Sequence, residues 1–172
     1  MTTIAETVRS SPVYRVPERA DLPDIQIIDA AAFRDRYPYF VLRQLLDAHS
    51  SGCVVAVEFG DDDEEKVVGY ALTIGEGGRA WLISLAVSPD ARGHGYGRGL
   101  LQHTVDVCRD KGDVDEVLLT VDPKNQPAYN LFKDFGFVLH ERDERYFGDD
   151  EPRDVLIYKV HRVPDPLPAL LD

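Results

Sequence analysis

Helices and strands can be assigned along this chain from the spacing of its apolar residues. Leu22, Ile25, Ile28 and Ala32 stand three or four residues apart, which places them on one face of a helix that Asp21 is expected to cap. Similar spacing predicts helices over 40–48 and 126–135. Short apolar runs rich in β-branched residues predict strands over 13–16, 53–59, 66–74, 79–87, 116–121, 138–146 and 154–160.

The stretch from Trp81 to Lys111 organises these elements. Its first part, 81–87, has the length and composition of a strand, and Ser88-Pro89-Asp90 ends it. Apolar residues return at helical spacing from Leu100 onward. Between strand and helix, glycines occupy every second position: Gly93, Gly95, Gly97 and Gly99.

A glycine-rich turn before a helix suits an anion. Glycine allows the backbone to approach a ligand closely, and the first N–H groups of a helix have no partner within it. A plain turn without a ligand is the simpler interpretation of the glycines alone. A Walker loop is excluded because Arg98 and Gly99, not Lys and Ser or Thr, follow Gly97. The dinucleotide fingerprint is excluded because the glycines simply alternate.

Two neighbouring motifs precede the helix: Leu85-Ala86-Val87-Ser88-Pro89 and Arg92-Gly93-His94-Gly95-Tyr96-Gly97. The second is similar to the R/Q-x-x-G-x-G/A signature of the GNAT superfamily of acetyl-CoA-dependent N-acetyltransferases, and the first resembles the bent strand that precedes this signature in the family. Further along, 125–137 resembles N-x-x-A-x-x-L-Y-x-x-x-G-F. The pattern is most similar to the branch that acetylates a ribosomal-protein alanine, a protein N-terminus. The resemblance covers about 53–160.

One α+β domain is expected, with a mixed, mostly antiparallel sheet flanked by helices. A length of 172 residues and 44% hydrophobic residues are sufficient for a single core. Residues 1–12 are polar and expected to be disordered. The N-acetyltransferase domain is expected over 13–162, followed by a C-terminal tail over 163–172.

The net charge of −12 argues against nucleic-acid binding, which needs a basic face, and fits a cationic acceptor. No apolar run approaches the ~18 residues of a membrane span, and no signal peptide is evident. Cys53 and Cys108 lie in apolar segments, as expected for core thiols in a reducing cytoplasm. No metal-ligand pattern is completed, including in the acidic turn 60–65. A monomer or a homodimer is expected.

The resemblance implies where acetyl-CoA binds. Backbone groups of Leu85, Ala86 and Val87 would hold the pantetheine arm and the thioester, with the N–H of Val87 as a donor to the carbonyl oxygen. The loop would wrap the pyrophosphate mainly through backbone N–H groups, with charge from two arginines. Its residues are Arg92, Gly93, His94, Gly95, Tyr96, Gly97 and Arg98. Asn125 would cap a helix and also contact pantetheine amides.

Phe132 departs from the family pattern. Many members have Tyr there, whose hydroxyl can protonate the leaving thiolate, and Phe has no proton to give. Tyr129, one turn earlier, and Tyr146 are the candidates for that role. No residue is compelling as the base that deprotonates the amine: Thr120 stands where the ribosomal-protein enzymes carry Glu, and Ser84 and Glu76 could act only through water.

Aromatic residues in two loops bear on the acceptor. Tyr37 and Tyr39 lie between the first two helices, and Tyr146-Phe147 lies near the end of the chain. By resemblance these loops frame the acceptor groove of protein N-terminal acetyltransferases, although loop aromatics also serve simply to cover a core. Three functions stay open: acetylation of a peptide α-amine or lysine, acetylation of a small amine such as an aminoglycoside or polyamine, and acyl-CoA sensing without turnover.

Overall fold

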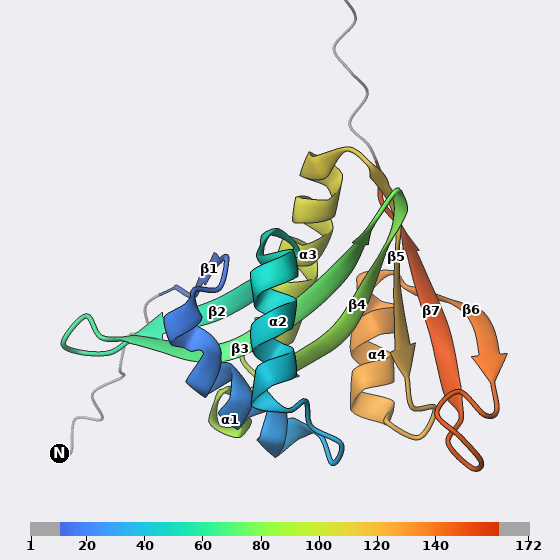
Figure 1. Cartoon of the computed structure of the whole chain (residues 1–172), viewed down its shortest axis with the longest axis horizontal. Coiled ribbons are helices and arrows are strands. Elements are labelled where there is room, and N and C mark those ends of the chain that lie inside the picture. The colour runs from blue at the N-terminus through green and yellow to red at the C-terminus, as the bar shows by residue number, and fades with distance from the viewer. Residues whose placement is uncertain (1–10, 162–172) are drawn as a thin grey trace, which may run out of the picture.

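A computed structural model describes residues 11–161, and Figure 1 shows its arrangement. The helices are α1 (Leu22–Ala32), α2 (Tyr39–His49), α3 (Tyr96–Lys111) and α4 (Gln126–Phe135). The strands are β1 (Val13–Arg15), β2 (Val54–Phe59), β3 (Glu65–Glu76), β4 (Gly78–Val87), β5 (Val114–Val121), β6 (Val138–Asp143) and β7 (Arg153–Lys159). The strands form one sheet in the order β1-β2-β3-β4-β5-β7-β6.

The sheet is antiparallel except where β4 and β5 pair in parallel, which confirms the predicted mixed, mostly antiparallel sheet. That parallel pairing is short. It begins at Gly78 with Val114 and ends at Trp81 with Leu118. Beyond this point β4 stays paired with β3, β5 stays paired with β7, and the two strands diverge (Figure 1). The sheet is therefore split along half of its central junction.

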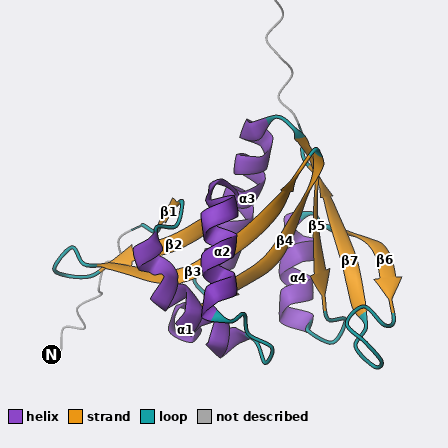
Figure 2. Ribbon diagram, in the orientation of Figure 1, coloured by secondary structure: helices purple, strands orange, loops and turns teal. Residues whose placement is uncertain are grey.

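Two layers of helix cover the sheet (Figure 2). Helices α1 and α2 pack on one face, over a core that contains Tyr70 and Leu72 of β3. Helices α3 and α4 pack on the opposite face, over a second core that contains Leu82 of β4 and Leu119 of β5. Helix α4 lies behind the diverging ends of β4 and β5 (Figure 1), and its Phe132 packs in the same core as Leu82 and Leu119.

A bulge in β4 changes which side chains face each helix layer. Leu72 pairs with Ser84 and Thr73 pairs with Leu82, so Ile83 is an extra residue in β4. Ile83 packs in the core under α1, and the Ser84 hydroxyl contacts Tyr70 in that same core. Two consecutive residues of β4 thus face the α1–α2 layer.

Most predicted elements are confirmed within a few residues. The strand expected over 138–146 is shorter and ends at Asp143, because turns and bends begin there. Asp21 precedes α1, as predicted, but its side chain does not cap the helix. Its carboxylate instead accepts hydrogen bonds from Arg15 Nη1 at 2.7 Å and from the Glu18 N–H at 2.7 Å. The expected termini fall largely outside the described residues: 1–10 and 162–172.

Tyr14 of β1 joins the edge of the sheet to α3. Its ring stacks on His103 with ring centroids 4.2 Å apart, and its hydroxyl lies directly over Gly99. A Cβ at position 99 would overlap the Tyr14 ring and hydroxyl, so this glycine is required by the close approach of a side chain. The contact fixes the first turns of the helix that carries the glycine loop.

We predict that Gly99→Ala lowers the free energy of unfolding by about 1–3 kcal/mol, the usual cost of overpacking. The loss occurs although alanine favours a helix by about 1 kcal/mol over glycine. Chemical denaturation measures the change. Gly97→Ala is the matched control, because its Cβ would meet only the end of the flexible Leu131 side chain. A Gly99→Ala variant as stable as wild type would contradict this account.

Candidate functional site

The unpaired half of β4 is the first component of the site. From Leu82 to Val87 the strand has no β5 partner, so one of its edges is open along this segment. Leu85, Ala86 and Val87, the residues predicted to hold an acyl group, all lie here. Leu85 and Val87 pack toward the α3–α4 core and Ala86 toward the α1–α2 core. The backbone of this segment is thus the part left for a ligand.

The glycine loop follows directly and ends in α3. Gly93 and Gly95 have φ values of +79° and +83°, a left-handed conformation that favours glycine. A Cβ at either position would meet nothing within 4 Å, so open space borders the loop. The first hydrogen bond inside α3 runs from the Gly99 N–H to the Gly95 carbonyl. The preceding N–H groups form the positive end of a 16-residue helix.

Side chains around the loop hold its shape. Arg92 Nε donates to the carbonyl of Val87 at 3.3 Å, which ties the loop to the end of β4. His94 Nδ1 lies 3.1 Å from the carbonyl of Ala91. Tyr96 is buried and its hydroxyl donates to the Glu58 carboxylate of β2. The arginine at position 98 extends over the ring of Phe135, 5.6 Å from its centroid.

Helix α4 brings Asn125 and Phe132 to the same side of the sheet. Asn125 is the N-cap, and its Oδ1 accepts from the Ala128 N–H at 3.3 Å, which confirms the predicted cap. Phe132 is buried in the core that contains Leu82 and Leu119, with its ring against Phe137 at 5.9 Å. An apolar ring therefore occupies the position where the family pattern has a hydroxyl.

Tyr129 lies one turn before Phe132 on α4 and packs against the same core, but its hydroxyl has a polar partner. It donates to Asp154 Oδ2 at 3.1 Å, at the start of β7. Asp154 is 1% exposed and also accepts from Arg142 Nε at 2.5 Å and Nη2 at 2.9 Å. The bonded Arg142 guanidinium lowers the pKa of the Asp154 carboxyl, whereas partial burial, then Asp154, raises the pKa of Tyr129. Tyr129 is thus a neutral phenol whose hydroxyl donates a hydrogen bond to a buried carboxylate.

The two aromatic loops lie at the same end of the sheet as the split between β4 and β5 (Figure 1). Tyr37 of the α1–α2 loop is half-buried, and Tyr39, the first residue of α2, is 42% exposed. In the β6–β7 loop, the exposed ring of Tyr146 stands edge-on to Phe147, with centroids 4.9 Å apart. Arg153 covers Phe147 at 4.9 Å. The sequence prediction that these loops belong to one site is consistent with this placement.

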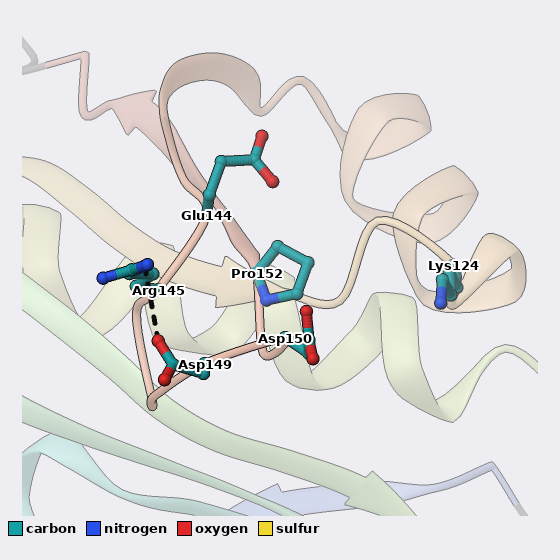
Figure 3. Close-up of a pocket in the computed structure, with 6 residues that line it drawn as sticks. All are labelled: Lys124, Glu144, Arg145, Asp149, Asp150 and Pro152. Atoms are coloured by element: carbon teal, nitrogen blue, oxygen red, sulfur yellow. Dashed lines mark ion pairs between the residues drawn. The ribbon is translucent and has the colours of Figure 1, made fainter.

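A charged recess of about 700 Å³ adjoins the β6–β7 loop (Figure 3). Arg145 and Asp149 form an ion pair on one side of it, with Nε and Oδ1 3.3 Å apart. Its lining contains three carboxylates and two cations: Lys124, Glu144, Arg145, Asp149, Asp150 and Pro152. The recess is wide and open rather than a narrow groove.

Sequence reasoning missed the polar groups that are buried beneath these loops. Asp29 of α1 is 1% exposed and contacts Tyr70, which is fully buried. A signal existed, because Asp29 stands four residues after Ile25 and seven after Leu22, in the middle of the apolar face of α1. The Asp154–Arg142 pair left no comparable signal, since it joins two strands.

Within residues 11–161, no group of three or more His, Cys, Asp or Glu residues is arranged to hold a metal ion. In the same range, no helix has the length and apolarity that crossing a membrane requires.

Comparison with known proteins identifies the family. The model of the acetyltransferase (GNAT) family matches residues 19–137, which is more than half of the chain. The chain belongs to this family. It is therefore an acetyl-CoA-dependent N-acetyltransferase, and the resemblance seen in its two motifs is confirmed.

The GNAT domain is similar to proteins that act on N-termini. An N-alpha-acetyltransferase of Sulfolobus acidocaldarius is 29% identical over 149 residues, covering 80% of this chain and 86% of that protein. Ard1 from Thermoplasma volcanium shares the fold with a TM-score of 0.79 at 19% identity, covering 89% and 100% of the two chains. Arabidopsis thaliana Naa50, in complex with the bisubstrate analogue CoA-Ac-MVNAL, has a TM-score of 0.73 at 23% identity, covering 87% and 99%.

The Asp154 site predicts how acid weakens this GNAT domain. The pKa of Asp154 is lower in the folded than in the unfolded protein, so its charge stabilises the fold above the unfolded value of about 3.9. That contribution is lost as the pH falls through the lower, folded pKa. Asp154→Asn should therefore be less stable than wild type at pH 7, and the difference should shrink below about pH 4. Denaturation measured from pH 7 to pH 2 checks this. A difference that grows on acidification would contradict it.

Proposed function

We propose that this GNAT enzyme transfers the acetyl group of acetyl-CoA to the α-amine of a protein or peptide, with lysine amines as the related possibility. The observation that carries the proposal is the split between β4 and β5. It opens the backbone of Leu82–Val87 at the end of the sheet where a helix N-terminus and two aromatic loops also lie. Acetyl transfer to a peptide requires a site for the thioester next to a site for the peptide, and these features would provide the two sites.

Acetyl-CoA fits the α3–α4 side of the split. The open space beside Gly93 and Gly95 leaves room for a pyrophosphate against the backbone N–H groups of the loop. Arg92 and Arg98 are exposed and add positive charge. The pantetheine arm would then run along Leu85–Val87. Asn125 already caps α4 through one side-chain oxygen, and its amide N–H₂ is the part that would contact the arm.

The reaction in this proposal is direct attack of a neutral amine on the thioester carbonyl. The Val87 N–H is the candidate donor to the oxygen on which negative charge develops. The amine must lose one proton, and the departing thiolate gains one or leaves unprotonated. A thiol with an ordinary pKa of about 8.5 is a good leaving group, so the apolar ring of Phe132 is compatible with turnover.

The acceptor assignment is supported by the α1–α2 and β6–β7 loops. The exposed phenols of Tyr39 and Tyr146 can donate hydrogen bonds to a peptide backbone while their rings pack against its first side chain. Tyr37 would line the same groove from the first loop. The names of the Sulfolobus relative and of the Arabidopsis complex, which holds a peptide analogue, agree with this substrate class.

A small cationic amine is the second candidate acceptor. The charged recess beside the β6–β7 loop has an excess of carboxylates over cations, and it is wide enough for a polyamine or an aminoglycoside. The chain as a whole has a net charge of −12, which attracts cations and disfavours nucleic acid.

We infer a cytoplasmic protein, because Cys53 and Cys108 are buried free thiols, and we expect a monomer or a homodimer.

Thiol release with a matched panel of acceptors tests the proposal. A lysine-free peptide with a free N-terminus should release CoA thiol and gain one acetyl group on its α-amine by mass spectrometry. The same peptide with a blocked N-terminus is the control and should remain unchanged. Activity confined to polyamines or aminoglycosides would replace the peptide assignment. Acetyl-CoA binding without thiol release from any acceptor would instead identify an acyl-CoA sensor.

The two candidate acids can be separated by single substitutions. If a phenol protonates the leaving thiolate, its change to Phe should lower kcat by ~10²-fold or more. Tyr146 has an exposed hydroxyl, whereas the Tyr129 hydroxyl is bonded to Asp154. Steady-state kinetics of Tyr146→Phe and Tyr129→Phe measure this, with Phe132→Tyr as the variant that restores the family hydroxyl. If neither loss changes kcat, the thiolate leaves unaided.

A further inference from the structure

A buried carboxylate connects the α1–α2 loop to the sheet. Asp29 Oδ2 accepts a hydrogen bond of 2.8 Å from the backbone N–H of Tyr37, in the middle of that loop. Its other oxygen, Oδ1, accepts a hydrogen bond of 2.5 Å from the hydroxyl of Tyr70 on β3. Asp29 is 1% exposed and Tyr70 is fully buried. Both carboxylate oxygens are thus committed to protein partners.

The connection continues to β4. The hydroxyl of Tyr70 lies 2.9 Å from Ser84 Oγ, and Ser84 is also buried. A phenol has one O–H proton, and Tyr70 uses it to donate a hydrogen bond to Asp29. The Ser84 hydroxyl must therefore be the donor in its bond with the Tyr70 oxygen. Burial, then the bond to Asp29, raises the pKa of Tyr70, which keeps the phenol protonated for this arrangement. The hydrogen bonds therefore run in one order, from Ser84 to Tyr70 to Asp29.

The two ends of this chain of hydrogen bonds lie at the two substrate sites. Ser84 belongs to the segment of β4 that has no β5 partner, one residue before Leu85. It faces the α1–α2 layer because the extra residue Ile83 shifts the register of β4. Tyr37 lies in the loop assigned to the acceptor. The buried hydrogen bonds thus connect the β4 segment proposed to hold the acetyl group with the α1–α2 loop proposed to hold the acceptor.

We propose that Asp29, Tyr70 and Ser84 are positioning residues that set the distance between the acceptor amine and the acetyl group. The inference rests on the proposed function of the α1–α2 loop and of β4. An amine attacks a carbonyl only from about 3–3.5 Å, and a displacement of about 1 Å costs ~10²-fold in rate. A loop held only by its flanking helices would not fix that distance. The two hydrogen bonds of Asp29 fix it, because they tie the backbone of the loop to the sheet through one buried carboxylate.

Tyr70→Phe is the decisive variant, because it keeps the ring in the core and removes only the central link. Asp29→Asn breaks one of the two links at Asp29, since an amide has a single acceptor oxygen and cannot accept from both the Tyr37 N–H and the Tyr70 hydroxyl. Thr73→Val is the matched control: it deletes a buried hydroxyl from the same strand, and the Thr73 hydroxyl has no hydrogen-bond partner. All variants are assayed as the full chain with the amine that the wild type acetylates best.

The proposal expects an acceptor effect that is separate from the cofactor effect. In Tyr70→Phe, kcat/KM for the acceptor should fall ~10–100-fold, through a lower kcat, a higher KM for the acceptor, or both, because the amine is misplaced relative to the thioester. The KM for acetyl-CoA should change by less than about threefold, because the glycine loop lies outside the network. Asp29→Asn should show the same pattern. The double variant should be no worse than the more impaired single variant, because the groups act as one unit.

Three results would overturn the proposal. Tyr70→Phe could be indistinguishable from Thr73→Val in every kinetic constant and differ only in thermal stability, as expected of a purely structural contact. The pH profile of kcat could change shape in Tyr70→Phe, which would assign the network to proton transfer. The effects of the two single changes could simply add. Absence of peptide acetylation by the wild type would refute the proposed function instead.

In that case, amide hydrogen exchange of residues 33–38 tests the network without an activity assay. If these amides exchange at the same rate in Tyr70→Phe as in the wild type, the network does not hold the loop and the inference is refuted.

Discussion

The separation of β4 from β5 after Trp81 and Leu118 is the constraint on which the rest of the structure depends. Backbone groups in the middle of a sheet normally pair with the neighbouring strand, and leaving them unpaired costs free energy unless a ligand or water satisfies them. Here β3 and β7 continue the pairing on the outer sides, so the split does not disrupt the sheet. Helix α4 fills the space behind the split with Phe132. The fold thus keeps one stretch of backbone available in an otherwise satisfied core.

The two sides of the sheet divide the chemistry between them. On one side, the loop from Arg92 to Arg98 borders open space, with the first N–H groups of α3 and two exposed arginines beside it. On the other side, hydrogen bonds among Asp29, Tyr70 and Ser84 hold the α1–α2 loop, which we propose forms part of the acceptor site. The bulge at Ile83 turns two consecutive residues of β4 toward that side. In the proposed function, the two substrates meet at the split in the sheet.

Much of this arrangement could be predicted from the sequence, because local signals carry it. The alternating glycines predicted a strand, loop and helix, and the spacing of Asn125 to Gly136 predicted a capped helix that ends at a glycine. Asp21 was predicted as a cap from its position alone, and a distant partner, Arg15, takes its carboxylate instead. The length of the β4–β5 pairing, the bulge at Ile83 and the bonds of Asp29 depend on contacts between residues far apart in the chain. No single-sequence pattern reports those contacts.

Amide hydrogen exchange of the wild-type protein with and without acetyl-CoA tests the central claim most directly. If the split strand and the glycine loop hold the cosubstrate, protection should increase over 85–98 and at the start of α4, and the far edge β6 should be unchanged. The claim is contradicted if acetyl-CoA binds and slows exchange elsewhere while 85–98 exchanges at the same rate as in the free protein.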